Sequence, residues 1–238
     1  MHFDADYGNA APLNLISAIL LYGSTDCIRL ATVHTPECDP QGGPPLLGEG
    51  QPVTRSFLET LCRGLQCEMP AAFLPEHVLL YSPSLVAWWE PAQIRAMFFS
   101  DQCDGKTLNG KLFPHPPLLF AVVEDHLHVW ALDTKHRPTP DTPLFMAPYW
   151  NVYEDGRVCH GSMAVPRTAG IDSLAQWSGA FFTSRFTHSN FGIPPCCHPE
   201  GFLGLWQTLA GKKRFPVHYL LPKRTLRETL CRNNRSTI

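Results

Sequence analysis

The chain has 238 residues, of which 44% are hydrophobic and 17% are charged, a length and composition that fit a folded protein of one or two domains and exclude a disordered chain. Its nine cysteines are odd in number and irregularly spaced, and no basic leader opens the sequence, so a disulfide framework and export are not expected. The longest apolar run, near LISAILLY, is far shorter than the roughly 20 residues of a membrane span. We therefore expect a cytoplasmic protein with reduced thiols and no membrane partner.

The formal net charge of −2 hides an uneven distribution. From residue 211 onward there are eight Lys or Arg and one Glu, a local charge of +7, so residues 1–210 sum to −9 (−2 minus 7). A solvated basic tail is the simpler interpretation, and contact with an acidic partner is the alternative. Nucleic acid is not expected as a partner apart from this tail.

The N-terminal part predicts a small β extension. Residues 13–35 contain two runs rich in Ile, Leu and Val around the turn-forming cluster GSTD, a pattern typical of a hairpin. Residues 36–52 are rich in Pro and Gly and are expected to be a linker. The sequence thus predicts an extension over residues 1–52 and a main domain over 53–238.

The main domain is expected to begin with an amphipathic helix near Ser56, which with Glu59 forms a candidate capping box. Short strands follow at HVLLYS, LVAWW, LLFAVVE and LHVWAL, and the last two are predicted to form a hairpin joined at DH. We expect residues 78–89 and 118–132 to form one antiparallel sheet that the helix covers.

Two helices are predicted after the strands. Asp172 is a candidate cap for the first, and the second is expected to stop at Gly211. The inward-facing residues are expected to be Leu174, Trp177, Phe181, Phe182, Phe202, Leu205, Trp206 and Leu209. The fold class is therefore α+β, with the strands preceding the C-terminal helices.

Cys159 differs from the other cysteines in its surroundings. Cys27, Cys62 and Cys67 lie in or beside apolar patterns, where a free cysteine usually behaves as a small buried hydrophobe. Cys159 follows the charged turn EDG and precedes His160 and a glycine, so its thiol is expected near the surface. A reactive thiol must be accessible.

A cysteine at such a place suits acyl transfer, because a thiolate attacks acyl groups and can carry them as thioesters. Charge then develops on a carbonyl oxygen. Asn151, eight positions before Cys159, is a candidate to donate an N–H to that oxygen or to brace the intervening loop. The sequence leaves both roles open.

Metal and cofactor sites are not expected. The adjacent cysteines of CCHP, residues 196–199, lack the spacing of a zinc site, and no second pair lies at a suitable distance. His126 and His128 would share one face of a strand without a third ligand. No Gly-rich phosphate loop or serine-nucleophile elbow is present.

The stretch NVYEDGRVC resembles the active-site segment of ubiquitin-conjugating enzymes. In that family an Asn, an aliphatic residue, a turn with Gly and a second aliphatic residue precede the catalytic cysteine. Asn151, Val152, Gly156, Val158 and Cys159 fill these places. The resemblance implies the ubiquitin-conjugating-enzyme-like fold of that family, with an antiparallel meander before the cysteine and helices after it.

Other stretches narrow the resemblance. HPPLLFAVV, FFTSRFTH and residues 142–163 look like the PRTRC system protein B family, a bacterial branch classed as prokaryotic ubiquitin-conjugating-like family D. The similarity extends over about residues 10–220. It implies partners encoded nearby, often on a mobile element: a ThiF-like activating enzyme, a small ubiquitin-like protein, a JAB-type peptidase and a ParB-related protein.

The resemblance also implies a mechanism. Cys159 would accept the C-terminus of the ubiquitin-like protein as a thioester and pass it to an amine without a cofactor. Asp155 and His160 are candidate auxiliaries that deprotonate the amine. Tyr149, a third candidate auxiliary, and Trp150 stand where the family has His and Pro, which puts the geometry of the loop in question.

Two alternatives stay open. A non-catalytic module could use the same fold to bind a ubiquitin-like protein within such a cassette. A cysteine hydrolase would instead need a histidine held against the thiol. His188 could reach Cys159 only through folding, because it lies far away in the sequence.

Overall fold

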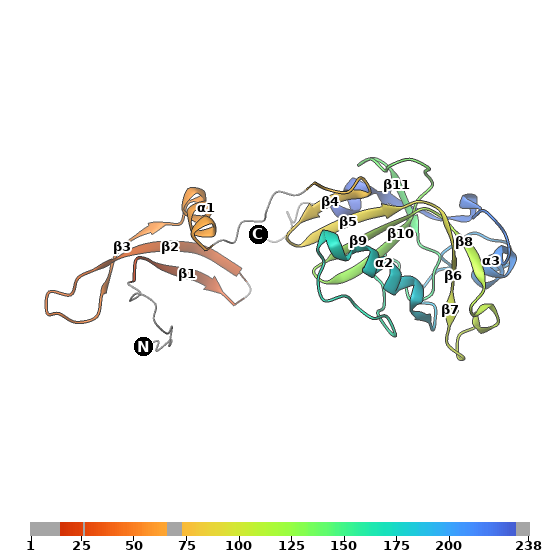
Figure 1. Cartoon of the computed structure of the whole chain (residues 1–238), viewed down its shortest axis with the longest axis horizontal. Helices are drawn as coiled ribbons and strands as arrows, with labels where there is room; N and C mark the ends of the chain where they lie inside the picture. The colour runs from red at the N-terminus through yellow and green to blue at the C-terminus, as the bar shows by residue number, and fades with distance from the viewer. Residues whose placement is uncertain (1–14, 26, 66–72, 232–238) are drawn as a thin grey trace. The chain divides into compact units, whose positions relative to one another are not determined.

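The computed structural model describes residues 15–25, 27–65 and 73–231. The chain divides into two compact units, Met1–Ala72 and Phe73–Ile238. Figure 1 shows the strands and helix of the first unit and the larger α+β assembly of the second.

The first unit contains a three-stranded antiparallel sheet. Its strands are β1 (Ala18–Ser24), β2 (Cys27–Glu37) and β3 (Leu46–Pro52), in the order β1-β2-β3. The predicted hairpin corresponds to β1 and β2. The segment expected to be a linker instead supplies β3, which pairs with β2.

The Pro- and Gly-rich residues form the loop of this second hairpin. The Asp39 carboxylate accepts N–H bonds from Gln41 and Gly43, each 3.0 Å long. Gly42 has a φ of 75°, a backbone conformation that glycine adopts without steric cost. Turn residues therefore reverse the chain here and allow a strand to follow.

The N-cap of helix α1 (Arg55–Gly64) lies two residues earlier than predicted. Thr54 is its N-cap and accepts the N–H of Phe57, whereas Ser56 lies inside the first turn. None of the helix residues is buried. Its predicted packing against the sheet of the second unit stays a prediction, because α1 belongs to the first unit.

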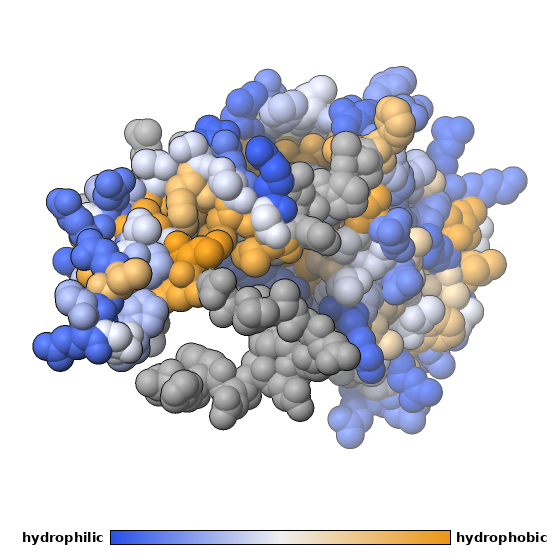
Figure 2. All heavy atoms as spheres, turned by 60° about the vertical axis from the view of Figure 1, so that its left-hand side comes forward, coloured by the Kyte–Doolittle hydropathy of each residue, from blue (hydrophilic) through white to orange (hydrophobic). Residues whose placement is uncertain are grey.

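Apolar residues of the first unit remain largely exposed. Ile16 is 84% exposed and Ile28 is 63% exposed, and Leu21 and Leu58 are also exposed. Figure 2 shows patches of apolar residues at the surface of the molecule. An apolar sequence pattern in this unit therefore does not indicate a buried position.

A six-stranded antiparallel sheet forms the centre of the second unit. In spatial order its strands are β13 (Pro222–Thr225), β11 (Pro143–Met146), β10 (His126–Ala131), β9 (Leu118–Val123), β5 (Leu85–Glu90) and β4 (Val78–Ser82). The prediction that residues 78–89 and 118–132 belong to one antiparallel sheet is confirmed.

The β9–β10 hairpin turns at Glu124 and Asp125, not at the predicted DH pair. These two residues have φ values of 48° and 66°. A two-residue turn with both central residues at positive φ matches the twist of the flanking strands. His126 therefore belongs to β10, where it pairs with Val123.

Successive residues of the central strands pack into two hydrophobic clusters. Trp88 and Phe120 stack at a ring distance of 5.4 Å in the larger cluster, which also contains Phe181. Ala87 and Ala121, the neighbours of those aromatic residues in sequence, belong to the smaller cluster. Since side chains alternate along a strand, the clusters lie on opposite faces of the sheet.

The helices of the second unit are α2 (Leu174–Thr183), α3 (Gly201–Leu209) and α4 (Leu226–Leu230), with short 3-10 helices η1 (Lys106–Leu108), η2 (Ile171–Ser173) and η3 (Val217–Tyr219). Of the predicted inward-facing residues all are buried except Phe202, which is half-buried against the core. Asp172 lies within η2 and is not the cap of α2, whose N-cap is Ser173. The α2 and α3 residues pack in the larger cluster, and α4 packs on the opposite face through Leu226.

An insertion between β5 and β9 reaches the other end of the unit. It contains β6 (Gln93–Ala96), β7 (Phe98–Phe99) and β8 (Leu112–His115). β6 pairs with β8, and β7 pairs in parallel with β12 (Arg185–Phe186). The β7–β12 pairing thereby holds the segment that follows α2 against the insertion. The predicted mixture of helices and antiparallel sheets is confirmed, and the more specific ubiquitin-conjugating fold stays a prediction.

Candidate active site around Cys159

Cys159 follows a tight turn that is hydrogen-bonded to strand β10. Val152 and Val158 form an antiparallel bridge, and the N–H of Val158 donates to the carbonyl of Leu127 at 2.8 Å. The N–H of Val129 donates to the carbonyl of Gly156, also at 2.8 Å. The turn is thus hydrogen-bonded to the central sheet, which holds the backbone next to Cys159 in place.

Gly156 is required at its position for two reasons. Its φ of 90° lies in the region that side chains disfavour. A Cβ atom at this position would lie 2.5 Å from Cε2 of the Trp130 indole. The glycine therefore lets the turn lie directly on a buried tryptophan.

The backbone of Asn151 connects two neighbouring segments. Its carbonyl accepts the N–H of Cys159 at 2.6 Å, and its own N–H donates to the carbonyl of His188 at 3.1 Å. Its φ is 61°, a left-handed conformation that asparagine tolerates better than most residues. Cys159 and His188 consequently lie on either side of Asn151.

The side chain of Asn151 is buried and braced. Its Oδ1 accepts the backbone N–H of Thr187 at 3.1 Å and the Thr187 hydroxyl at 2.8 Å. Its Nδ2 donates to the carbonyl of Arg185 at 3.2 Å. These bonds support the loop-bracing role, and an oxyanion would have to use the second N–H of the amide.

The exposures of the cysteines differ from those predicted. Cys27 and Cys62, expected to be buried, are exposed. Cys67 lies outside the described residues. Cys159 is half-buried, whereas Cys103 is buried and desolvation raises its pKa to about 11. Accessibility alone therefore does not distinguish Cys159 from the other thiols.

Tyr149 and Trp150 are both fully buried beside the turn. The Tyr149 hydroxyl is hydrogen-bonded to Nδ1 of His115 at 2.9 Å, and Nε1 of Trp150 donates to Asp104 at 2.7 Å. Burial raises the pKa of Tyr149 well above its usual range and lowers that of His115 to about 4. Tyr149 therefore anchors the loop in the core and offers no group to a bound substrate.

The two other candidate auxiliaries differ in their surroundings. Asp155 is exposed, and its carboxylate accepts the N–H of Arg157 at 3.0 Å within the turn. His160 stacks on His126 at a ring distance of 6.0 Å, and its Nε2 is buried without a hydrogen-bond partner among the described residues. Burial and the proximity of His126 lower the pKa of His160.

The structure adds Thr187 to the site, and it brings near Asn151 the residue His188, which the sequence named only as a histidine that folding could bring to Cys159. Thr187 holds the Asn151 amide, and its Oγ1 lies 2.9 Å from Nδ1 of the exposed His188. Both residues follow β12, whose pairing with β7 depends on the insertion between β5 and β9. Both lie in the family-like stretch FFTSRFTH, but that stretch gives no sign of its position relative to Cys159, which only the fold supplies.

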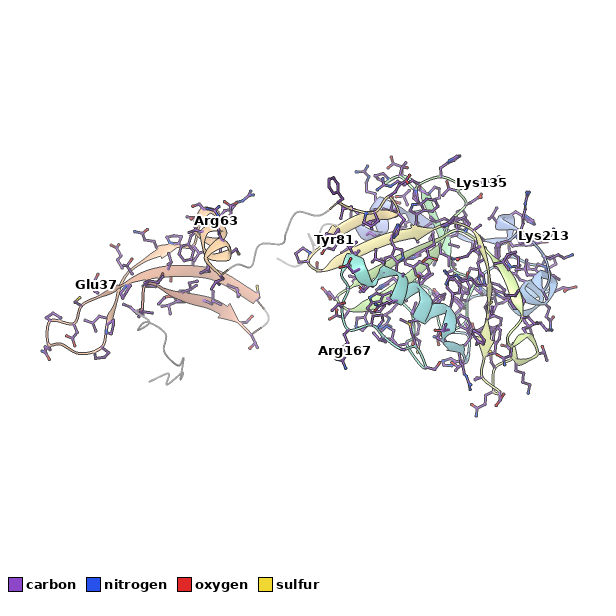
Figure 3. All side chains as sticks on the ribbon, in the orientation of Figure 1. Glu37, Arg63, Tyr81, Lys135, Arg167 and Lys213 are labelled. Atoms are coloured by element: carbon purple, nitrogen blue, oxygen red, sulfur yellow. The ribbon has the colours of Figure 1, made fainter. Side chains whose placement is uncertain are left out.

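The basic residues near the C-terminus line a surface cavity. Lys213 and Arg214 border a hollow of about 340 Å³ together with Lys135, over an apolar floor that includes Phe215. Figure 3 labels Lys135 and Lys213 on the second unit. Arg227 contacts Asp141 at 3.5 Å, and both side chains are largely exposed. Solvated charges and a binding surface both fit this arrangement.

Over the described ranges, no three or more His, Cys, Asp or Glu side chains are grouped so that they could hold a metal ion. In the same part of the chain no helix has the length and apolarity needed to cross a membrane.

A sequence comparison places this chain among E2-like proteins. Residues 55–223, more than half of the chain, match the sequence model of prokaryotic E2 family D. The chain therefore belongs to prokaryotic E2 family D. No curated protein and no solved structure matches it.

Proposed function

We propose that the protein is a ubiquitin-conjugating-like carrier. It accepts the C-terminus of a small ubiquitin-like protein as a thioester on Cys159 and transfers it to an amine. A ThiF-like activating enzyme supplies the activated ubiquitin-like protein, as expected from the resemblance to the PRTRC system protein B family. A JAB-type peptidase is a further candidate partner. Membership of prokaryotic E2 family D supports the class of function.

The observation that carries the proposal is the coupling of Cys159 to Asn151. The 2.6 Å bond from the Cys159 N–H to the Asn151 carbonyl fixes the backbone of the cysteine beside a buried amide. A buried, preorganised donor stabilises a developing oxyanion far better than a mobile one. Cys159 itself is half-buried, whereas Cys103 and Cys196 are buried.

The test is incubation with the activating enzyme, ATP and the ubiquitin-like protein encoded beside the gene. The wild-type protein should form an adduct that a thiol reductant cleaves. Cys159→Ser should form an adduct that resists the reductant, because an oxyester exchanges with thiols far more slowly. A wild-type protein that forms no reducible adduct with these partners is not a carrier.

Asn151→Ala separates the two roles of the amide. If the second N–H serves the oxyanion, loading should persist and discharge to an amine should slow about 100-fold, the usual effect of losing one such donor. If Asn151 only braces the loop, loading and discharge should fall together and the thermal midpoint should drop. The loss of three buried hydrogen bonds makes a lower midpoint expected in both cases, so the ratio of the two rates decides.

A non-catalytic module that binds the ubiquitin-like protein is the second candidate. The three hydrogen bonds on the Asn151 side chain favour it, since they commit the amide to structure. This candidate predicts binding without ATP and without an adduct, and it predicts that Cys159→Ala binds as well as the wild type.

A further inference from the structure

Two short contacts of the Thr187 hydroxyl determine which ring nitrogen of His188 carries the proton. Oγ1 of Thr187 lies 2.8 Å from Asn151 Oδ1 and 2.9 Å from His188 Nδ1. The orientation of the Asn151 amide follows from the Thr187 backbone N–H, which points at Oδ1 and requires an acceptor there. The hydroxyl must therefore donate its one hydrogen to Asn151.

The second contact is then a hydrogen bond only if His188 Nδ1 carries a proton and donates it to Thr187. A neutral imidazole has one N–H, so its other nitrogen, Nε2, bears the free lone pair. His188 is exposed, and no hydrogen bond reaches Nε2 from any residue that the structure describes. The ring thus presents an unoccupied base to solvent.

Backbone hydrogen bonds bring the His188 segment close to the cysteine. Val152 pairs with Val158 in antiparallel fashion, and Tyr153 pairs in parallel with Asn190. The N–H of Cys159 donates to the Asn151 carbonyl and the N–H of Asn151 donates to the His188 carbonyl, so the backbone of Asn151 lies between those of Cys159 and His188.

Two strand spacings separate the backbones of Cys159 and His188, a distance of about 10 Å. The acyl group on the thiol and an incoming amine fit within that distance.

We propose that Nε2 of His188 accepts the proton of the amine that discharges the thioester on Cys159. This inference rests on the proposed function, because it concerns the second step of the same reaction. The two other candidates differ from His188: Oδ1 of Asp155 accepts the Arg157 N–H within the turn, and Nε2 of His160 is buried. His188 is exposed, and its backbone is separated from that of Cys159 by Asn151 alone.

Discharge begins when an alkylammonium gives a proton to His188 Nε2 and becomes a neutral amine. The amine nitrogen attacks the thioester carbonyl carbon, so a C–N bond forms and the C–S bond breaks. The Cys159 thiolate leaves with the electron pair, and the second proton of the nitrogen passes to water. The products are an amide, a thiolate and an imidazolium that returns its proton to solvent.

His188→Asn is the decisive variant, because the asparagine amide N–H can replace Nδ1–H as a donor to Thr187 while the base is removed. Loading of Cys159 should persist, and single-turnover discharge to free lysine should slow about 100-fold, within the range for a general base. Discharge to hydroxylamine, which is already unprotonated at neutral pH, should change by less than about threefold. His136→Asn, a change of another exposed histidine, should discharge at the wild-type rate.

Chemical rescue completes the test. In His188→Ala, added imidazole should raise the rate of lysine discharge in proportion to its concentration. The inference is overturned if His188→Asn discharges to lysine as fast as the wild type, or if lysine and hydroxylamine are affected equally. Absence of any thioester in the wild type would instead contradict the proposed function. Release of the partner into water at the same rate with and without lysine would identify a hydrolase and overturn both.

Discussion

Replacing Gly156 with alanine is expected to destabilise the second unit and to displace the turn that leads to Cys159. The new Cβ would lie 2.5 Å from Cε2 and 2.6 Å from Nε1 of the Trp130 indole. Trp130 cannot retreat easily, because it is only 4% exposed and stacks on His128. The backbone also has a φ of 90°, which an alanine adopts only under strain.

Both effects have known sizes. A non-glycine residue at positive φ costs about 1–2 kcal/mol, and forcing extra atoms into a packed core costs about 1–3 kcal/mol. The free energy of unfolding should therefore fall by about 2–5 kcal/mol. Urea denaturation, monitored by tryptophan fluorescence, measures this loss as a shift of the transition midpoint.

Two other glycines provide controls. Gly110 has a φ of 74°, and a Cβ added there would have no atom within 4 Å, so Gly110→Ala should show the backbone strain alone. Gly170 has a φ of −78°, and a Cβ added there would have no atom within 4 Å, so Gly170→Ala should change stability by less than about 0.5 kcal/mol. A Gly156→Ala protein as stable as Gly110→Ala would refute the claim that the turn rests on Trp130.

Three further results are expected. Burial holds the pKa of His115 near 4, against 6.5 in the unfolded chain, so between these pH values the unfolded state binds more protons and stability falls as pH falls. The loss should approach about 3 kcal/mol at pH 4 and should be absent from urea titrations of His115→Gln, and an equal pH slope in that variant would contradict this reasoning. Brief alkylation followed by peptide mapping should label exposed Cys27 before half-buried Cys159, and Cys159 before buried Cys103. Labelling of Cys103 first would show that the cysteine burial is misassigned. If the basic residues bind an acidic partner, affinity should fall with added salt, and replacing residues 212–214 with serine should remove that dependence; unchanged affinity would leave these residues as solvated charges.

The central sheet was predictable because its strands carry strong local signals. Short runs such as LLFAVV are long enough for one strand, rich in β-forming residues and bounded by polar turns. The inward faces of α2 and α3 followed equally from helical periodicity. Local pattern determines such elements, so it suffices to find them.

The first unit shows where local pattern fails. The Pro and Gly residues of segment 36–52 indicated a linker, yet Asp39 closes them into a hairpin loop and β3 follows. Cys27 and Cys62 lay in apolar patterns and are exposed. Burial depends on what packs against a face, and no single segment encodes that.

The candidate site likewise contains residues that local sequence identifies and residues that only the fold brings together. Asn151, Gly156 and Cys159 lie within nine residues and could be found by their spacing. Thr187 and His188 come beside them only because β12 pairs with β7 from a distant insertion. The spacing therefore identified the turn, and the tertiary fold was needed to find the residues that surround it.

The most direct measurement of the central claim is the intact mass of the protein after incubation with the activating enzyme, ATP and the ubiquitin-like partner, combined with peptide mapping of the attachment site. The account predicts a mass increase equal to the partner less one water, attached to Cys159, lost on adding thiol reductant and absent from Cys159→Ala. An adduct on another cysteine, or the same adduct in Cys159→Ala, would contradict it.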